Sequence, residues 1–384
     1  MNPATDKGRL TLSDEQRLAW LRLIRSDNVG PATFRDLINH FGTAAAALEA
    51  LPELARRGGV AARIRVASED QAEREMDAAE RIGARFVATG EPDYPPLLRG
   101  LDHPPPLICV RGDIALALDP CVAVVGARNA SITGAKLATR FAAGLGEAGY
   151  PIVSGLARGI DAAAHKATLA TGTIAVFAGG LDMPFPDENA ALAGEIVERG
   201  GAIVSEMPIG WQPRSKDFPR RNRLIAGIAL GVLVVEAAKR SGSLITARLA
   251  NETGRQVFAV PGSPLDPRAE GTNHLIKQGA TLVTDVSDIV ESLQPVGGGE
   301  TQLPYLAGES DDEPWREREP GPAGETDQAT REAIIAALGP SPVEIDDIVR
   351  FSGAGIAQVQ LVLIELDLAG RLERHPGNRV SIQP

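Results

Sequence analysis

The residues of this chain that could do chemistry gather in four short segments rich in glycine, hydroxyl side chains and cations. Three segments begin at Gly126, Ser154 and Ala178, and the fourth runs from Glu236 to Ala247. Each follows directly on an apolar, β-branched run. Glycine lets a ligand approach the backbone closely, and free amides at the start of a helix attract anions. Because all four occupy the same kind of position, we predict that they form one anion-binding crevice.

A further segment adds positive charge to this crevice. Residues 210–255 carry nine basic and three acidic residues, although the whole protein has a net charge of −11. The centre of the segment reads Lys216-Asp-Phe-Pro-Arg-Arg-Asn-Arg223. Arginine presents a planar fork of donors that suits phosphate. We expect Arg221 and Arg223 to be ligands, because they precede a stretch that is predicted to be buried.

Several of these residues suit either ligand binding or a purely structural role. Arg128 suits either a ligand phosphate or an intramolecular ion pair. Phe218, the one aromatic residue of 216–223, suits a stacked base, worth about 1–3 kcal/mol, or core packing equally well. Ser241-Gly242-Ser243 is either a phosphate-binding nest or a simple tight turn.

Buried parallel strands are expected to position these segments. Apolar runs predict strands at 122–125, 152–153, 174–177, 202–204, 232–235, 257–260 and 282–283. Helical stretches at 133–147, 160–170, 192–198, 247–252 and 273–278 separate them. Strands without polar alternation, joined by helical crossovers, indicate an α/β doubly wound parallel sheet. Ligands of such sheets bind beyond the carboxyl ends of the strands.

No catalytic residue, metal or cofactor is expected. Two cysteines and five scattered histidines have no metal-ligand spacing. A triad of Ser154, His165 and Asp182 can be written, but Ser154 lacks the nucleophile-elbow pattern. The turn at Gly126 does not continue as a dinucleotide-binding Gly-x-Gly-x-x-Gly. The alternative is a nucleotide-processing, phosphoribohydrolase-like enzyme, whose characteristic glutamate is missing from 241–247.

The segments before and after the predicted sheet domain have different sequence patterns. We predict an N-terminal helical domain at 1–88, the Rossmann-like domain at 89–294, a flexible linker at 295–327 and a winged helix at 328–384. The helical domain contains a Gly30-Pro31 turn typical of SAM or helix-hairpin-helix units, although plain helical packing explains it slightly better. The winged helix is predicted from three helices, 327–338, 344–351 and 355–369, and a hairpin. It has no cation in its third helix, which favours protein contact over DNA reading.

The linker explains most of the acidity. Residues 295–327 hold nine acidic and two basic residues together with eleven glycines or prolines. Such a composition does not support a packed core. No signal-peptide core is present at the N-terminus, and the longest near-apolar run, 224–235, is too short to span a bilayer. We therefore expect a cytoplasmic protein without a membrane partner.

The same segments, read in order, resemble the DNA-processing protein A (DprA/Smf) family over residues 94–285. The resemblance is carried by Val125-Gly-Ala-Arg128, Val153-Ser-Gly-Leu-Ala-Arg-Gly-Ile-Asp161, Phe218-Pro-Arg-Arg-Asn-Arg223, Ser241-Gly-Ser-Leu-Ile-Thr-Ala247 and Val257-Phe-Ala-Val-Pro-Gly262. One departure is Ala127, where the family more often has serine.

The resemblance implies an extended Rossmann fold that binds single-stranded DNA in a basic pocket. It also implies a homodimer that protects incoming DNA and loads the RecA recombinase during natural transformation. An N-terminal helical domain and a C-terminal winged helix are common additions in the family. The DNA-binding residues that it implies here are Gly126, Arg128, Ser154, Gly155, Arg158, Gly159, Lys216, Phe218, Arg220, Arg221, Asn222, Arg223, Lys239, Ser241, Gly242, Ser243 and Thr246.

Overall fold

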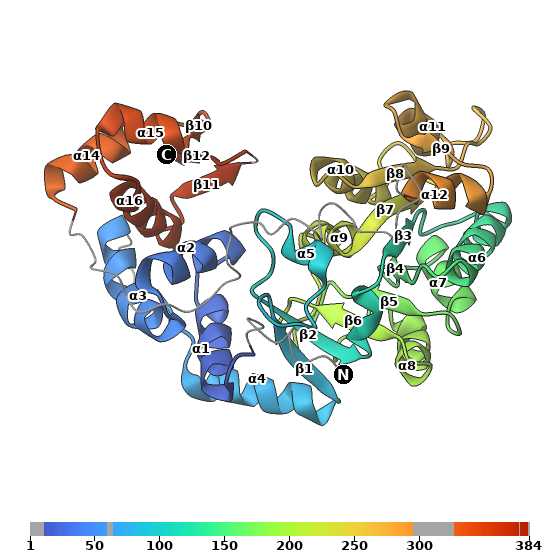
Figure 1. Ribbon diagram of the computed structural model, residues 1–384, viewed down its shortest axis with the longest axis horizontal. Coiled ribbons are helices and arrows are strands. Elements are labelled where there is room, and N and C mark those ends of the chain that lie inside the picture. Colours follow the sequence, from blue (N-terminus) through green and yellow to red (C-terminus); the bar gives the residue numbers. More distant parts are fainter. Residues whose placement is uncertain (1–10, 60–63, 295–325, 376, 383–384) are drawn as a thin grey trace, which may run out of the picture. The chain divides into compact units, whose positions relative to one another are not determined.

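The computed structural model describes residues 11–59, 64–294, 326–375 and 377–382 (Figure 1). The chain divides into two compact units, one made of Met1–Arg74 with Glu313–Pro384 and the other of Glu75–Asp312. Helix α4 (Glu69–Arg81) crosses the boundary between them in sequence. Most of the predicted linker, 295–327, lies outside the described residues.

The second unit is built on a sheet of nine strands in the part of the chain that is described. The strands are β1 (Ala84–Ala88), β2 (Leu107–Gly112), β3 (Cys121–Val125), β4 (Ile152–Ser154), β5 (Thr173–Val176), β6 (Ala202–Ser205), β7 (Ala229–Val234), β8 (Gln256–Ala259) and β9 (Thr281–Leu282). Their order is β1-β2-β6-β5-β4-β3-β7-β8-β9. From β6 to β9 neighbouring strands are parallel, while β1 and β2 are antiparallel additions at one edge.

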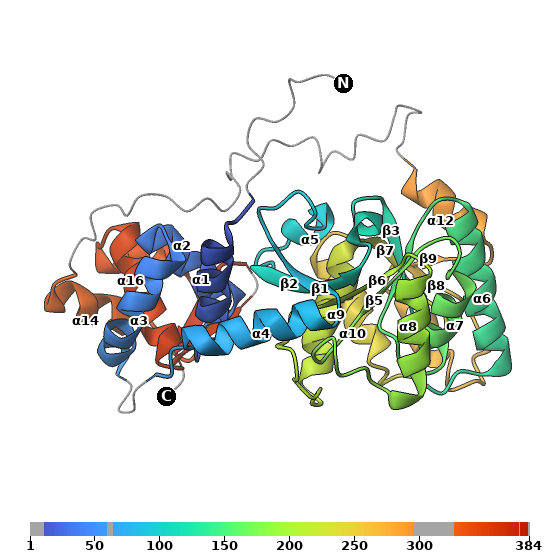
Figure 2. The same ribbon diagram turned by 90° about the horizontal axis from the view of Figure 1, so that it is seen from below.

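Helices cover both faces of this sheet. The helices of the unit are α5 (Pro96–Arg99), α6 (Ile132–Glu147), α7 (Ile160–Ala167), α8 (Ala190–Glu198), α9 (Asp217–Ile228), α10 (Ser243–Glu252), α11 (Glu270–Lys277) and α12 (Val286–Leu293), with short 3-10 turns at Ile114–Ala117 and Asp187–Asn189. Alternate side chains of β3 enter two separate cores, one with α6, α7 and α12 and the other with α9, α10 and α11. The ribbon shows α6 and α7 on one side of the strands and α9 and α10 on the other (Figure 2). Burial on both faces explains why the strands read as continuous apolar runs.

All seven predicted strands are present, so the predicted fold class is confirmed. The predicted start of the sheet domain at 89 is too late, because β1 pairs with β2 from Ala84↔Arg111 to Ala88↔Leu107. The chain runs outward from β3 to β6 and returns through α9 to β7, which lies beside β3. The carboxyl ends of β3, β4, β5 and β7 therefore open toward the same edge of the sheet.

The first unit combines both ends of the chain. Its elements are α1 (Asp14–Arg25), α2 (Pro31–Phe41) and α3 (Ala44–Gly58), followed by α14 (Gln328–Ala336), α15 (Ile345–Ser352) and α16 (Ile356–Leu368) with a small sheet of β10 (Val343–Glu344), β12 (Arg379–Ile382) and β11 (Leu372–His375). The three predicted winged-helix helices and the hairpin are confirmed.

Helix α16 is buried on two sides. Its residues Val359, Val362 and Leu366 belong to the winged-helix core, whereas its opposite face packs on α3 and α2. Gly58 lies so close that a Cβ there would be 2.0 Å from the backbone oxygen of Glu365. The winged helix therefore packs against the N-terminal helices of the same unit, and its contact with a partner protein in place of DNA stays a prediction.

The turn before α2 takes part in this contact. Asn28 Nδ2 donates to the Leu368 carbonyl at 2.8 Å, and Thr33 Oγ1 donates to Asp367 Oδ2 at 2.8 Å. The helix-hairpin turn thus caps a protein helix. Among the described residues no single helix is long and apolar enough to cross a membrane, and only α15 with α16, bent by 116°, reaches the required length and composition.

Candidate nucleic-acid interface

A buried arginine lies at the carboxyl ends of β4 and β5. Arg221, on the first turns of α9, is only 6% exposed, and its Nη1 donates to the Val176 carbonyl at 2.9 Å. The guanidinium packs closely against Gly155, where a Cβ would be 1.7 Å from Nη1. Only glycine leaves room for this arrangement, so the turn after β4 is shaped around the guanidinium.

The charge of Arg221 is incompletely matched. Its Nε has no hydrogen-bond partner, and in the described ranges no carboxylate lies within 4.0 Å of it. The Asp161 carboxylate instead accepts from the amides of Gly155 at 3.1 Å and Ala157 at 3.3 Å. Burial lowers the pKa of Arg221 to about 10, with Asp161 opposing and Arg128 adding to the effect. The group is still a cation at neutral pH, and it has an unused donor.

Arg128 completes a cationic and aromatic surface beside this site. It is exposed, and its Cζ lies 5.0 Å from the centroid of the Phe218 ring. The Phe218 ring lies 5.5 Å from that of Phe185, which is 48% exposed. The loops after β3 and β4 meet here, since the amide of Ile160 donates to the Ala127 carbonyl at 3.3 Å. Phe185 was not predicted, because the sequence gives no signal that pairs it with Phe218.

Two of the predicted DNA-binding arginines, Arg220 and Arg223, form ion pairs within the protein. The Glu206 carboxylate, 4% exposed, accepts from Arg220 Nε at 2.9 Å and forms a second ion pair with Arg223. Arg223 Nη1 also donates to the His103 carbonyl at 3.0 Å. The prediction that Arg223 is a free phosphate ligand does not fit this geometry. The pair anchors α9 to the end of β6.

Other predicted cations are exposed and vary in their partners. Lys239 lies 3.5 Å from Glu270, and Arg158 lies 3.3 Å from Glu188. Exposed pairs of this kind are worth little and exchange readily for another anion. Lys216 is exposed and has no ion-pair partner within the described residues.

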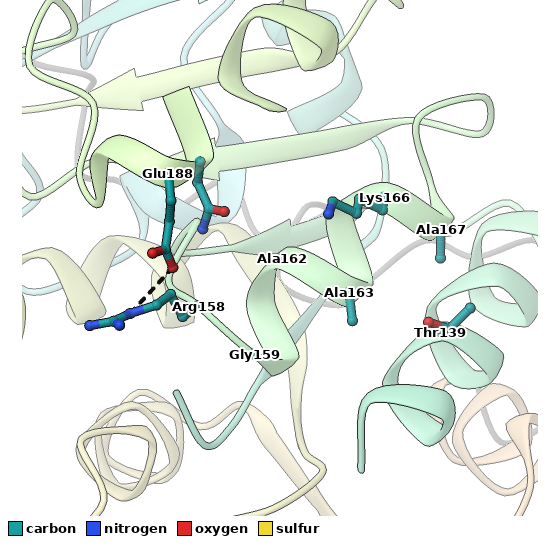
Figure 3. Close-up of a pocket in the computed structure, with 9 residues that line it drawn as sticks. Thr139, Arg158, Gly159, Ala162, Ala163, Lys166, Ala167 and Glu188 are labelled. Atoms are coloured by element: carbon teal, nitrogen blue, oxygen red, sulfur yellow. Dashed lines mark ion pairs between the residues drawn. The ribbon is translucent and has the colours of Figure 1, made fainter. Parts of the chain in front are cut away.

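A shallow hollow of about 530 Å³ adjoins the loop after β4. It is lined by Arg158 and Gly159, by Ala163 and Lys166 of α7 and by Thr139 of α6. The ion pair of Arg158 with Glu188 stands at one end of this hollow (Figure 3). Arg221 does not line it, so the hollow extends the loop surface and does not contain the buried guanidinium.

The turn before α10 shows which hydroxyls are available. Gly242 is exposed with open space around its Cα, and Asn222 Nδ2 donates to its carbonyl at 3.3 Å. Ser241 Oγ and Ser243 Oγ are 2.7 Å apart. Thr246 is only 1% exposed. The open part of this predicted nest is therefore Ser241 and Gly242.

The side chains of Ser154, His165 and Asp182 each contact a different partner, although His165 Nε2 is buried without one. Ser154 has no exposed surface, and its Oγ donates to the Val124 carbonyl at 2.6 Å. His165 Nδ1 lies 2.7 Å from Thr173 Oγ1, and burial lowers the pKa of His165 to about 3. Asp182 accepts from the Gly210 amide. Ser154, His165 and Asp182 thus have separate partners and form no catalytic triad.

The phosphate position of a dinucleotide-binding fold is filled by the chain itself. At the start of α6, between β3 and β7, the Glu236 carboxylate accepts from the Ser131 amide at 2.9 Å. A Cβ on Gly134 would be 2.3 Å from Glu236 Cδ. A pyrophosphate at this helix start would meet that carboxylate, in agreement with the missing Gly-x-Gly-x-x-Gly pattern.

Comparison with known proteins agrees with this architecture. Residues 85–294 match the family model described as DNA recombination-mediator protein A, 14–78 a DprA-like N-terminal HHH domain and 318–378 a DprA winged helix domain. The chain is 41% identical to Protein Smf of Escherichia coli over 76% of its own length and 75% of that protein. It is 31% identical to Protein Smf of Synechocystis over 96% and 99%.

Solved structures give the same result. The X-ray structure of DNA processing protein A from Streptococcus pneumoniae is 36% identical, with a TM-score of 0.56 over 74% of this chain and 94% of that one. A Helicobacter pylori DNA processing protein A, whose structure concerns its single-stranded DNA binding mode, is 28% identical, with a TM-score of 0.50 over 55% and 95%. By sequence and by fold, this chain belongs to the DNA-processing protein A (DprA/Smf) family.

Proposed function

We propose that this protein binds single-stranded DNA through its phosphates at the ends of β3, β4 and β5, and that it does so without catalysing a reaction. The observation that carries the proposal is the buried Arg221 guanidinium, whose Nε has no partner. Burying an unpaired charge is costly, so such groups concentrate where a ligand supplies the counter-charge. A phosphate that reached Arg221 and Arg128 would take up the unused donor.

The aromatic surface favours a single strand over a duplex. The rings of Phe218 and Phe185 are paired, and Arg128, which interacts electrostatically with Arg221, lies over the Phe218 ring. A base can stack on such rings only when it is not stacked within a helix. The Helicobacter pylori relative, whose structure describes single-stranded DNA binding, supports the same ligand.

The wider role follows from the family. We extend the proposal to a homodimeric, cytoplasmic protein that protects incoming DNA and loads RecA in natural transformation. This extension is supported by membership of the DprA/Smf family and by relatives named as DNA processing proteins.

The test compares Arg221→Gln with a matched control. Fluorescence anisotropy with labelled oligo(dT) and with duplex DNA should show single-strand preference and an affinity that falls steeply with salt, by about −0.7 in log–log slope for each phosphate bound. Arg221→Gln should bind at least about tenfold more weakly. Arg85→Gln, which removes an exposed arginine paired with Asp93 on the edge strand β1, should bind as the wild type does. Wild-type affinity in Arg221→Gln would refute the proposal.

A further inference from the structure

A second pair of arginine and aromatic side chains lies just before α9. The Arg214 guanidinium stands over the indole of Trp211, with 4.4 Å from Cζ to the ring centroid. One carboxylate fixes both partners: Asp217 Oδ2 accepts from Trp211 Nε1 at 2.9 Å and from the Arg214 amide at 2.8 Å. Asp217 is 5% exposed, so this anchor is part of the folded core and not a surface coincidence.

The backbone around Trp211 is held as firmly as its ring. The Trp211 carbonyl accepts from the Gly180 amide at 2.9 Å, and its amide donates to the Pro208 carbonyl at 3.1 Å. The loop after β5 approaches so closely that a Cβ on Gly179 would be 2.7 Å from the Trp211 oxygen. A flat side chain in such a setting loses little entropy when another flat group stacks on it.

The charge of Arg214 is not matched by an ion pair within the described residues. Arg214 is exposed, and no carboxylate of the described residues pairs with it, in contrast to Arg220 and Arg223 on the following turns. The indole lies on one side of the guanidinium, and because the Arg214 side chain is exposed, a partner can approach it from solvent. Nucleic-acid bases stack on arginine planes as they do on aromatic rings.

The position connects this pair with the proposed DNA site. Asp217, which accepts a hydrogen bond from Trp211, directly precedes Phe218 in the sequence. The guanidinium of Arg128 lies over the Phe218 ring. Exposed Lys216 lies between the two pairs in sequence. We propose that Trp211 and Arg214 form a second base-stacking platform, so that the single strand places one base at Phe218 and another on the Arg214 plane. This inference rests on the proposed function and deepens it.

The first test removes the planar guanidinium of Arg214 and keeps its positive charge. Arg214→Lys keeps the cation but removes the planar group, so it should weaken binding of oligo(dT) by between about 5-fold and 150-fold while leaving the salt slope unchanged. The effect should disappear on an abasic oligonucleotide of equal length, because that strand offers phosphates but no base. Arg248→Lys, which changes another exposed arginine, on α10, is the control and should bind as the wild type does.

The second test uses the indole as a reporter. The chain has three tryptophans, of which Trp20 has no exposed surface. In a Trp315→Phe variant, oligo(dT) should quench the tryptophan fluorescence. The oligonucleotide concentration at half-maximal quenching should equal that at half-maximal anisotropy change, and the further change Trp211→Leu should abolish the quenching. Undiminished dT binding by Arg214→Lys, or an equal loss on abasic DNA, would overturn the platform while the Arg221 site stands. If the wild type fails to bind dT at low salt, both proposals fall.

Discussion

Arg128 and Arg223 give the sharpest contrast in the basic region, because the sequence treats them alike and the structure does not. Arg128 is exposed, lies over the Phe218 ring and has no ion-pair partner among the described residues, whereas Arg223 pairs with a Glu206 side chain that is 4% exposed. Replacing each with methionine removes the same charge and keeps a similar stem. We expect Arg128→Met to change DNA binding and Arg223→Met to change stability.

The magnitudes follow from these contacts. Breaking a buried ion pair destabilises a protein by about 3–5 kcal/mol, and since Arg220 remains on Glu206 we expect about 2 kcal/mol for Arg223→Met. In a unit of this size that lowers the melting temperature by about 4–8 °C. Arg128→Met should melt as the wild type does, but its log–log salt slope for oligo(dT) should be smaller by about 0.7.

Circular dichroism melts and anisotropy titrations between 50 and 300 mM salt measure both quantities on the same preparations. The titrations are made well below the lower melting temperature, so that both variants are folded. If Arg223→Met melts normally and loses salt slope, the ion pair with Glu206 does not define the role of Arg223. The division into ligand and structural arginines is then wrong.

Four further outcomes are expected. Gly155→Ala should weaken oligo(dT) binding at least about tenfold, because its Cβ would displace Arg221; anisotropy measures this, and unchanged affinity contradicts it. Gly242→Ala should leave the melting temperature unchanged, since φ is −62° and the space is open, while DNA affinity falls severalfold. Gly58→Ala should destabilise the first unit in chemical denaturation, although alanine normally favours a helix by about 1 kcal/mol, because α16 approaches too closely. Burial lowers the folded-state pKa of His165 to about 3, so between about pH 6.5 and 3 only the unfolded chain takes up a proton at this residue. The free energy of unfolding should therefore fall by about 3 kcal/mol from pH 6.5 to 4. Denaturant titrations at several pH values measure this fall, and His165→Gln should remove it.

The sheet was predictable because its strands are buried on both faces, and their apolar runs record this directly. The edge strand β1 was missed because it follows helix α4 after a two-residue gap, and its pairing with β2, from Ala84↔Arg111 to Ala88↔Leu107, depends on residues far along the chain. A sequence pattern does not record such a distant partner. The predicted domain boundary therefore fell after β1 and not before it.

The site was predictable at the level of segments and not of individual side chains. Arg221 and Arg223 are two positions apart on α9 and therefore project in different directions. One enters the space left by Gly155, and the other meets Glu206. Trp211 was missed for a related reason, since its stacking on Arg214 depends on the turn that Asp217 holds.

The position of the proposed phosphate site follows from one carboxylate. In a doubly wound sheet the first helix start, beside the switch in strand order, is the usual place for a ligand phosphate. Here Glu236 supplies the negative charge at the start of α6 from within the chain. The unmatched positive charge lies instead one and two strands away, where Arg221 spans the ends of β4 and β5. An anion would therefore be repelled by Glu236 at the switch point and attracted by Arg221, which favours the proposed ligand that lies along the strand ends.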